Sequence, residues 1–586
     1  MSGSIRLTGV NGLPLGGSGL RYPGVYAALD FANNVYELGG VSRRALTALP
    51  GFTFTRASLA MGYDATGKLT YGPNNLCLQS QALGTSPWGV QYAGTGSTPV
   101  VTNNYAAAPD GTMTATRVQV ALNGGTAAAD QSYPVQGCTC PTARGSFYVK
   151  TNDGSTKTIY VRGSFAATKV VTGAWTRIDF DAGTLSATQF GIGLRGGQAS
   201  PCSDSADLLV WGAQLEAVTY QTTPSTYYPT TTAAYYGPRL VYDPVTLASL
   251  GILVEEARTN LCLQSQAFGT TWVLSNGTLT ANSAVSPDGT TTADTLVGTA
   301  ASSQGRLAQS FAGSIGATYT LSCYVKSAGG TLARLYFDDN ATNAASVTYD
   351  SITGAVSVAA SASGGNWTAV SSTAQQLGSG WWRFSLTFTA TTVAPQRVVL
   401  FHRDVSDGTN GIYLWQAQLE QAVGASSPIP TTTASVTRAA DAATLSGLSA
   451  AAPYSAVSEF NIPRTASGVD IINWGTLANG GGQYVVSSGN AWVRESSSTT
   501  ANVAGGTVTA NAAQKMASRY AVNDVNISVN GGIATADTSV TPPTISTLGL
   551  GPAQVSFGGI YPNGTISRIR VYNRALSDAQ LQSLTS

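Results

Sequence analysis

The sequence predicts an all-β protein made of antiparallel sandwiches, and three observations carry this prediction. A long segment of the chain occurs twice, with the same landmarks in the same order. Within both copies, apolar and polar residues alternate with a period of two, which places one face of each strand in a core. Sustained helical periodicity is almost absent, and Gly, Asn, Asp and Pro separate the alternating runs, as in sandwich proteins.

The duplication is visible as identical strings. Residues 75–82 read NLCLQSQA, and residues 260–267 repeat that string without change. Later landmarks pair collinearly, which indicates a duplicated domain. They are Trp88 with Trp272, Trp175 with Trp381, Trp211 with Trp415, and the string PDGT at residues 109–112 and 287–290. The distance between landmarks is longer in the second copy, which predicts an insertion of about thirty residues within residues 338–378.

Strand patterns and connectors suggest the division of the chain. With 586 residues and 43% hydrophobic residues, three or four domains of about 100–200 residues are expected. The connector between the repeats is rich in Pro and Thr and contains the phrase PTTTA at residues 229–233, and repeat 2 ends on the same phrase at residues 430–434. In the third unit, residues 525–532 predict a strand entering a hairpin turn, and residues 577–581 predict an N-capped final helix. The predicted parts are an N-terminal segment (1–74), repeat 1 (75–221), a connector (222–258), repeat 2 (259–430) and a C-terminal unit (431–586).

The charge balance excludes two classes of partner. The chain has 30 Lys and Arg against 29 Asp and Glu, and shows no basic block of the kind that binds nucleic acid or anionic lipid.

No apolar run reaches the roughly 18–20 residues that span a bilayer, so membrane insertion is not expected. The first residues, MSGSIR, lack the basic start and apolar stretch of a secretory signal. The product is therefore expected to accumulate in the cell that makes it.

Metal, cofactor and enzyme chemistry are not expected. The chain has one histidine and no CxxC pair, so we predict no zinc site and no cofactor. A glycan-degrading sandwich needs two convergent carboxylates, but the pairs Glu255–Glu256 and Asp338–Asp339 are adjacent and point to opposite faces of a strand. Asp338–Asn340 fits either a Ca²⁺ site or a polar turn, with the turn favoured. His402 lies outside any nucleophile motif, which favours a structural role.

The six cysteines fall into two groups. Cys77, Cys262 and Cys323 lie at strand positions and are expected to act as small apolar core residues. Three others, Cys138, Cys140 and Cys202, occur only in repeat 1. Assembly in a reducing cytosol means that folding should not require a disulfide among them, and whether they pair after release stays open.

Tryptophan is the residue type best suited to stack on a sugar ring. Six of the ten tryptophans pair between the repeats, which favours a role in the shared fold, and Trp382 lies on an apolar strand face. The unpaired Trp367, Trp474 and Trp492 are the carbohydrate-binding candidates, weighed against ordinary core positions. Trp367 is a candidate because it falls in the Gly/Ser-rich insertion.

Several phrases resemble a known family. They are FTRAS (54–58), YDPVT (242–246), EEARTNL (255–261) and the stretch from PTTT to TRAAD (430–441). Together they resemble appendage proteins of tailed bacteriophages, of the head-spike, head-fibre and tail-fibre type. The repeats look like carbohydrate-binding-module jelly rolls. The C-terminal unit, with its end motif at residues 566–577, looks like a concanavalin/laminin-G-type lectin sandwich. The resemblance thus implies two jelly-roll sandwich repeats, a concanavalin-like C-terminal sandwich and a small N-terminal segment that attaches to the virion.

The resemblance also implies a function. The expected protein is a non-enzymatic virion fibre or spike that binds host cell-surface glycans for adsorption, through several weak sites acting together. Its expected partners are other virion proteins and host surface polysaccharide, in a homotrimer that is assembled in the host cytoplasm and released by lysis. Two alternatives stay open at this point: a purely structural head or tail decoration without a glycan site, and a polysaccharide depolymerase.

Overall fold

The computed structural model describes residues 25–39, 41–299, 304–363, 365–403, 408–465, 468–476, 478–486, 488–495, 498–553 and 559–586. Strands dominate these residues, and every strand ladder in the sheets is antiparallel, which confirms the predicted all-β class. The chain forms two compact units. One is Thr70–Gly237, which contains repeat 1, and the other combines the described residues before Thr70 with Pro238–Ser586.

Two sheets form the C-terminal sandwich, and its core lies between them. The first sheet has the order β3 (Val41–Arg43), β2 (Val35–Leu38), β1 (Val25–Asp30), β43 (Gly564–Tyr572), β34 (Tyr454–Asn461), β39 (Gln514–Ala521), β40 (Asp524–Val529) and β41 (Gly532–Ile533), with β17 (Arg239–Tyr242) and β18 (Ser249–Val254) joined to it through β43. The second has the order β38 (Ser498–Thr507), β37 (Ser488–Glu495), β36 (Gly480–Val486), β35 (Val469–Gly475), β42 (Ile545–Leu550), β33 (Ala442–Ala450) and β4 (Phe52–Thr55).

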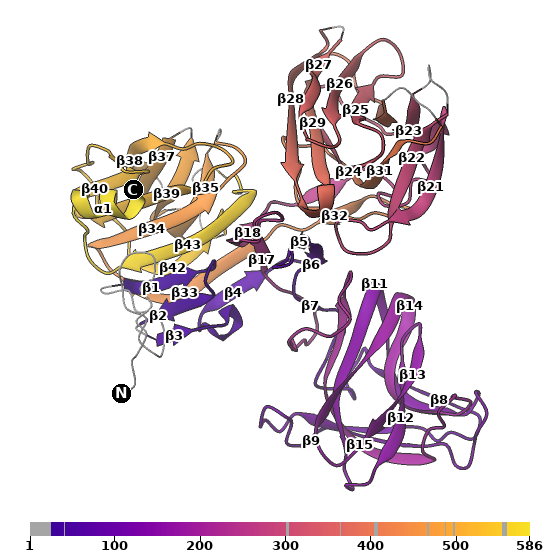
Figure 1. Cartoon of the computed structure of the whole chain (residues 1–586). Helices are drawn as coiled ribbons and strands as arrows, with labels where there is room; N and C mark the ends of the chain where they lie inside the picture. The colour runs from indigo at the N-terminus through magenta and orange to yellow at the C-terminus, as the bar shows by residue number, and fades with distance from the viewer. Residues whose placement is uncertain are drawn as a thin grey trace, which may run out of the picture. The chain divides into compact units, whose positions relative to one another are not determined.

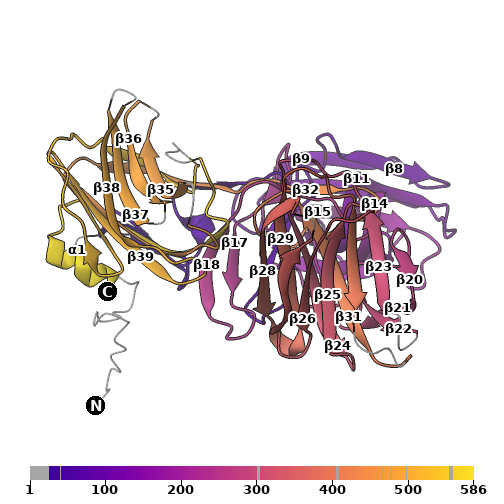
Figure 2. The same cartoon turned by 90° about the horizontal axis from the view of Figure 1, so that it is seen from above.

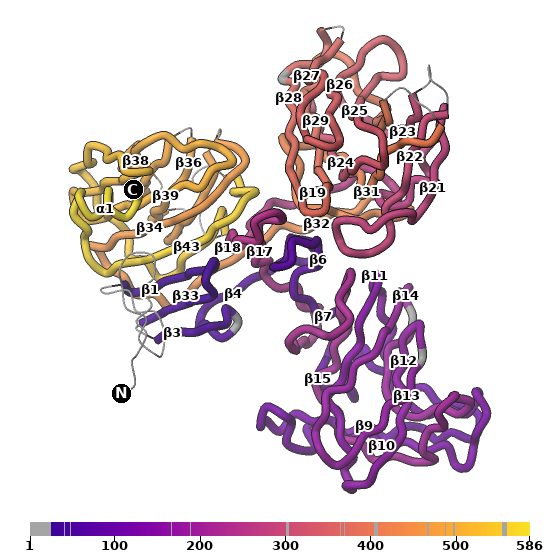
Figure 3. The backbone as a smooth tube through the Cα atoms, in the orientation of Figure 1, coloured from indigo at the N-terminus to yellow at the C-terminus, as the bar shows by residue number. Residues whose placement is uncertain are grey.

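The composition of this sandwich differs from the predicted division of the chain. Strands β1 to β4 come from the predicted N-terminal segment, and β17 and β18 come from the predicted connector. Figures 1 and 3 show β1 beside β43, although the two are near opposite ends of the sequence. Alternation reveals that a strand has a buried face, but it does not reveal which sheet the strand joins. The attachment role of residues 1–74 stays a prediction, and residues 1–24 lie outside the described residues.

Strand β1 is expected to be required for this sandwich. It lies between β2 and β43 and buries Ala27 and Leu29 in the core. A chain without residues 25–31 should therefore lose cooperative folding of the C-terminal sandwich, which near-ultraviolet circular dichroism and limited proteolysis would detect. Deletion of the edge strand β3, residues 41–43, is the matched control and should lower the stability of the sandwich much less. Equal protease resistance of the two deletions would contradict the expectation.

Repeat 1 is built around two long strands. Its strands form one hydrogen-bonded sheet of eight, in which β11 (21 residues) and β14 (20 residues) pair with register shifts along their ladder. The order is β13 (Ala166–Val171), β12 (Lys157–Arg162), β14 (Thr176–Arg195), β11 (Gln131–Thr151), β15 (Ser205–Ala217), β10 (Ala115–Ala121) and β9 (Val100–Ala106), with β8 (Gly89–Ala93) paired to β11.

Repeat 2 is a sandwich of two six-stranded sheets. One sheet has the order β20 (Val273–Ser275), β23 (Gly305–Ser310), β30 (Arg397–His402), β25 (Leu332–Asp338), β26 (Ala344–Asp350) and β27 (Val356–Ala362). The other has the order β21 (Gly277–Ala284), β22 (Ala293–Gly298), β31 (Gly411–Glu420), β24 (Thr318–Ala328), β29 (Trp382–Ala390) and β28 (Trp367–Gln376). The expected insertion lies at β27 and β28, which extend the edges of the two sheets.

The repeats share hydrogen bonds as well as strings. The Asn75 amide donates to Ala213 O at 3.1 Å, and Asn260 donates to Ala417 O at the same distance. Two of the three tryptophan pairs also make matching hydrogen bonds through their indole N–H groups. Trp88 bonds Leu78 O, Trp272 bonds Leu263 O, Trp211 bonds Thr114 Oγ1 and Trp415 bonds Thr292 Oγ1. These four positions hold each repeat together, in keeping with the role in the shared fold predicted for them.

Short elements join the sandwiches. They are the strands β5 (Met61–Tyr63), β6 (Leu69–Tyr71), β7 (Asn74–Asn75), β16 (Tyr235–Tyr236), β19 (Arg258–Asn260) and β32 (Val436–Arg438), the 3-10 turns η1 (Leu46–Ala48) and η2 (Gly378–Gly380), and the helix α1 (Asp578–Thr585). Ser577 caps α1 as predicted, and Leu581 packs it beside β39 (Figure 2). In the part of the chain that the structure describes, no helix combines the length and apolar character needed to cross a membrane.

Candidate functional site

The three candidate tryptophans are buried, so none offers a ring face to a sugar. The exposed fraction is 3% for Trp367 and 0% for both Trp474 and Trp492. Trp367 stacks on Phe388 at 4.7 Å between ring centroids and donates its indole N–H to Val393 O at 2.7 Å. The structure thus corrects the interpretation of these residues as binding platforms, because stacking on a pyranose requires an open face.

Trp474 shows why the prediction failed. Its indole N–H donates to the Tyr454 hydroxyl at 2.9 Å, and its ring packs edge-on against Tyr454 and Tyr520. A polar partner inside the core satisfies the one polar group of the side chain, so burial costs little. Sequence position carries no sign of such a partner, since Tyr520 and Trp474 lie on different strands of facing sheets.

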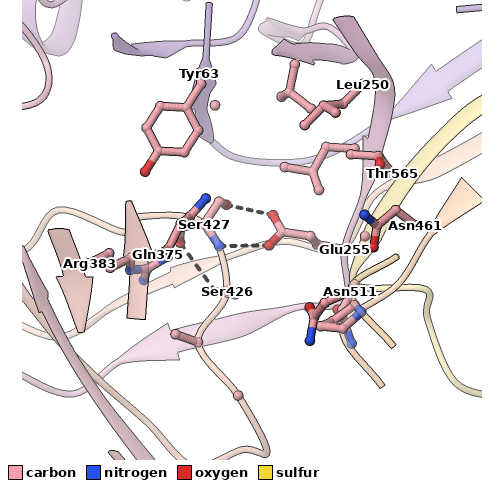
Figure 4. A pocket seen from close by; sticks show the side chains of 18 of the residues that line it. Tyr63, Leu250, Glu255, Gln375, Arg383, Ser426, Ser427, Asn461, Asn511 and Thr565 are labelled. Carbon is pink, nitrogen blue, oxygen red and sulfur yellow. Dashed lines mark hydrogen bonds between the residues drawn. The ribbon is translucent and has the colours of Figure 1, made fainter. Parts of the chain in front are cut away.

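A cavity of about 630 Å³ is a better candidate. It is lined by β5, β17 and β18, by β28 and β29 of repeat 2, and by loops of the C-terminal sandwich, all in one compact unit. Figure 4 shows Gln375 and Arg383 on one side of the cavity, Asn461 and Thr565 on the other, and Glu255 between them. Its size is in the range of ligand sites for small molecules.

Three amide side chains in this lining have no internal hydrogen-bond partner among the described residues. They belong to Gln375 on β28, Asn461 at the end of β34, and Asn511 in the loop before β39. Each amide carries a carbonyl acceptor and an NH₂ donor, the pairing that adjacent sugar hydroxyls can satisfy. The cavity therefore presents unused donors and acceptors to a polar ligand. The three come from segments far apart in the chain, so no spacing in the sequence marks them.

Beneath the cavity lies a buried ion network that joins four segments of the chain. Asp441 accepts hydrogen bonds from Arg56 at 3.0 Å and from Arg239 at 2.5 Å. Arg239 also bonds Glu255 at 2.7 Å, and Arg438 lies 3.5 Å from the same carboxylate. The side chains of all five are 3% exposed or less. With three guanidinium groups and two carboxylates, nearly every charge has an opposite partner, as burial requires.

The network keeps Glu255 ionised. Burial alone would raise the pKa of Glu255, but Arg438, Arg239 and hydrogen bonds from Ser427 lower it well below the usual value. The Ser427 backbone N–H and hydroxyl donate to this carboxylate at 2.7 and 2.6 Å (Figure 4). Burial, together with the neighbouring Arg239, lowers the pKa of Arg56 to about 10. Glu255 is thus a structural anion whose oxygens are already engaged.

The remaining candidates have structural partners. Arg397 binds Asp338 through two nitrogens at 3.0 and 2.7 Å, and Asp339 accepts backbone hydrogen bonds from Ala341 and Asn343, which is the polar-turn arrangement. His402 is buried and accepts a hydrogen bond at Nδ1 from the Gly298 backbone, in keeping with the structural role predicted for it.

All six cysteines are free thiols. Cys77, Cys262 and Cys323 are buried, as expected of core residues. Cys138 and Cys140 are also buried, whereas Cys202 is partly exposed. Among the residues that the structure describes, no group of three or more His, Cys, Asp or Glu side chains is placed to hold a metal ion.

Comparisons with known proteins give structural similarities only. No family model and no curated protein matches the chain. Among solved structures, it is similar to the CBM40 of a Ruminococcus gnavus IT-sialidase bound to alpha2,3 sialyllactose, with 14% identity over 23% of this chain and 83% of that one, and a TM-score of 0.20. It is also similar to a CBM22 tandem from Paenibacillus barcinonensis Xyn10C (13% identity, 60% and 98% covered, TM-score 0.19). Domains LG4-5 of the mouse laminin alpha1 chain match with 10% identity, 56% and 94% coverage and a TM-score of 0.17. Scores at this level carry no argument about function.

Proposed function

We propose that this chain is a bacteriophage virion appendage, a fibre or spike, that binds host cell-surface glycans through the cavity beside Glu255. The observation that carries the binding proposal is the set of unused amides at Gln375, Asn461 and Asn511 around one cavity. Sugars present pairs of hydroxyl groups that both donate and accept, and amide side chains match them in both directions. The appendage assignment rests on the family resemblance of the sequence phrases.

The lining favours binding over hydrolysis. Among the described residues, the carboxylates that line the cavity belong to Glu255 and Asp243. Glu255 accepts from Arg239 and Ser427, while Asp243 accepts backbone hydrogen bonds from Val245 and Thr246, which lower its pKa. A glycosidase acid must hold a proton near neutral pH, which requires a raised pKa. We therefore propose a non-enzymatic role, with weak sites added together in an assembly of several copies.

The first test uses intact candidate host cells and the purified full chain. Saturable binding that is lost after periodate oxidation of the surface sugars is expected, because oxidation destroys the vicinal hydroxyls that the amides would bind. Gln375→Ala and Asn461→Ala should each weaken binding roughly three- to tenfold, the effect of losing one or two neutral hydrogen bonds. Cell binding is measured by flow cytometry with labelled protein.

The chain offers a matched control for this test. Gln376 is the next residue on β28, is exposed and does not line the cavity, so Gln376→Ala should bind as the unchanged chain does. Binding that survives both Gln375→Ala and Asn461→Ala would place the glycan elsewhere. A folded, assembled sample that binds no candidate host would instead favour the structural decoration.

A further inference from the structure

One face of each repeat carries the same residues but differs in burial. In repeat 2, Tyr324, Trp381 and Arg383 are buried, whereas their counterparts in repeat 1 are only half-buried. The counterparts are Tyr148, Trp175 and Arg177. The local geometry is the same in both, since the guanidinium lies over the tyrosine ring at 5.3 Å in repeat 2 and 5.4 Å in repeat 1. The difference in burial therefore comes from what covers the face.

In repeat 2 the covering segment is the hairpin of β5 and β6. The Tyr63 hydroxyl lies 3.1 Å from the Tyr324 hydroxyl, within hydrogen-bond distance. The backbone N–H of Leu69 donates to Pro287 O at 3.0 Å, in the PDGT loop. One short hairpin thus supplies a tyrosine to the aromatic patch and a backbone donor to the loop beside it.

The PDGT loops follow the same pattern. Pro287 and Asp288 are buried in repeat 2, but Pro109, Asp110 and Gly111 of repeat 1 are exposed. The aromatic and cationic residues and the PDGT loop are thus both more buried in repeat 2 than in repeat 1. Both copies of the duplicated domain keep the aromatic and cationic residues of this face. Repeat 1 therefore has the same residue types that contact the hairpin in repeat 2.

A local residue covers only part of the face in repeat 1. Tyr227 packs on Trp211 at 4.7 Å between centroids and bonds the Ser80 hydroxyl at 2.6 Å. Trp175 keeps an open side, with Lys150 over its ring at 5.4 Å. Half-exposed aromatic rings beside cations are typical of surfaces that bind a partner.

We infer that the repeat 1 face, defined as Tyr148, Trp175, Arg177 and residues 109–112, binds a tyrosine-bearing β-hairpin of a partner protein. The hairpin would place its phenol beside Tyr148 and Arg177, as Tyr63 lies beside Tyr324 in repeat 2. A backbone N–H of the hairpin would donate to Pro109 O, as Leu69 donates to Pro287 O. This site is independent of the cavity proposed for glycans, since none of its residues lines that cavity.

The probe for this inference already exists within the chain. A peptide of residues 60–72, closed by a disulfide between cysteines at its two ends and verified as a hairpin by NMR, contains β5, its turn and β6. In the full chain the repeat 2 face is already covered by the native hairpin, so the peptide should bind repeat 1 only. Hydrogen–deuterium exchange on the full chain should show added protection of residues 109–112 and 175–177.

Substitutions on both partners test the contact. Trp175→Ser and Arg177→Ser should each weaken peptide binding at least tenfold. A peptide that carries Tyr63→Ser should bind the unchanged chain at least tenfold more weakly as well. Phe165→Ser is the matched control, because Phe165 is a 60% exposed aromatic residue of repeat 1 outside this face. Unchanged far-ultraviolet circular dichroism and thermal unfolding would show that the variants are folded.

Three results would overturn the inference. The first is a folded peptide that gives no protection at the repeat 1 face at millimolar concentration. The second is peptide binding that Trp175→Ser and Arg177→Ser leave unchanged. The third is self-association of the chain alone that Trp175→Ser abolishes, since a second copy would then already cover the face. Protection by the peptide, lost in both variants and kept in Phe165→Ser, supports the inference.

Discussion

Asp441→Asn is expected to lower the free energy of unfolding by about 3–5 kcal/mol. The substitution keeps the size of the side chain but leaves Arg56 and Arg239 buried without the carboxylate that both contact. Removing one partner of a buried ion pair exposes the full desolvation cost of the other, and here two cations lose the same anion. Calorimetric unfolding of the full chain should show the transition of the C-terminal sandwich at a clearly lower temperature.

A second Arg–Asp pair provides the control. Arg117 and Asp207 are about one-quarter exposed and pair at 2.6 Å in repeat 1, so Asp207→Asn should cost no more than about 1 kcal/mol. The contrast between the two variants separates burial from the mere presence of an ion pair. Equal losses in the two would mean that the Asp441 network is not the electrostatic centre that its burial indicates.

Trp474→Ala is expected to destabilise the same sandwich by about 3–5 kcal/mol. The substitution empties a fully buried position beside Tyr454 and Tyr520 and leaves the Tyr454 hydroxyl without the indole donor. Large-to-small changes in a core lose both the transfer free energy and the contacts around the cavity. Chemical denaturation followed by near-ultraviolet circular dichroism would measure the loss.

Trp175→Ala is the comparison for this variant, because Trp175 is half-buried. This substitution should lower the free energy of unfolding of repeat 1 by less than half of the loss expected for Trp474→Ala. Binding to host cells decides whether Trp474 acts as a core residue or as a sugar-binding platform. A Trp474→Ala chain that stays as stable as the unchanged chain and yet loses periodate-sensitive binding would restore the sugar-platform interpretation of this tryptophan.

The local parts of the fold were accessible from the sequence. Period-two alternation in residues 382–388 matches β29, and the string shared by residues 75–82 and 260–267 marks the start of two related sandwiches. Both signals lie within short windows, where strand periodicity and duplication are recorded directly. The membership of β1 in the sheet of β43 leaves no such local trace.

The candidate site was less accessible, for two reasons. Burial of Trp367, Trp474 and Trp492 depends on residues contributed by other strands, so position in the chain is a poor guide to it. The buried ion network did leave a sign, because Arg56, Glu255 and Asp441 lie in the phrases FTRAS, EEARTNL and TRAAD. In a chain with only 10% charged residues, opposite charges concentrated in separate phrases could have suggested a shared contact.

Because β1 pairs with β43, this sheet can be completed only at the end of translation. A ribosome adds about 5–20 residues per second, so the nascent β1 precedes its partner by on the order of a minute. During that time both repeats can complete their own sandwiches, while β1 to β4 wait with unpaired edges that attract other strands. Chaperone binding to these early strands, or a rise in aggregation when translation is slowed between repeat 2 and the last strand, would be the cellular sign of this interleaved order.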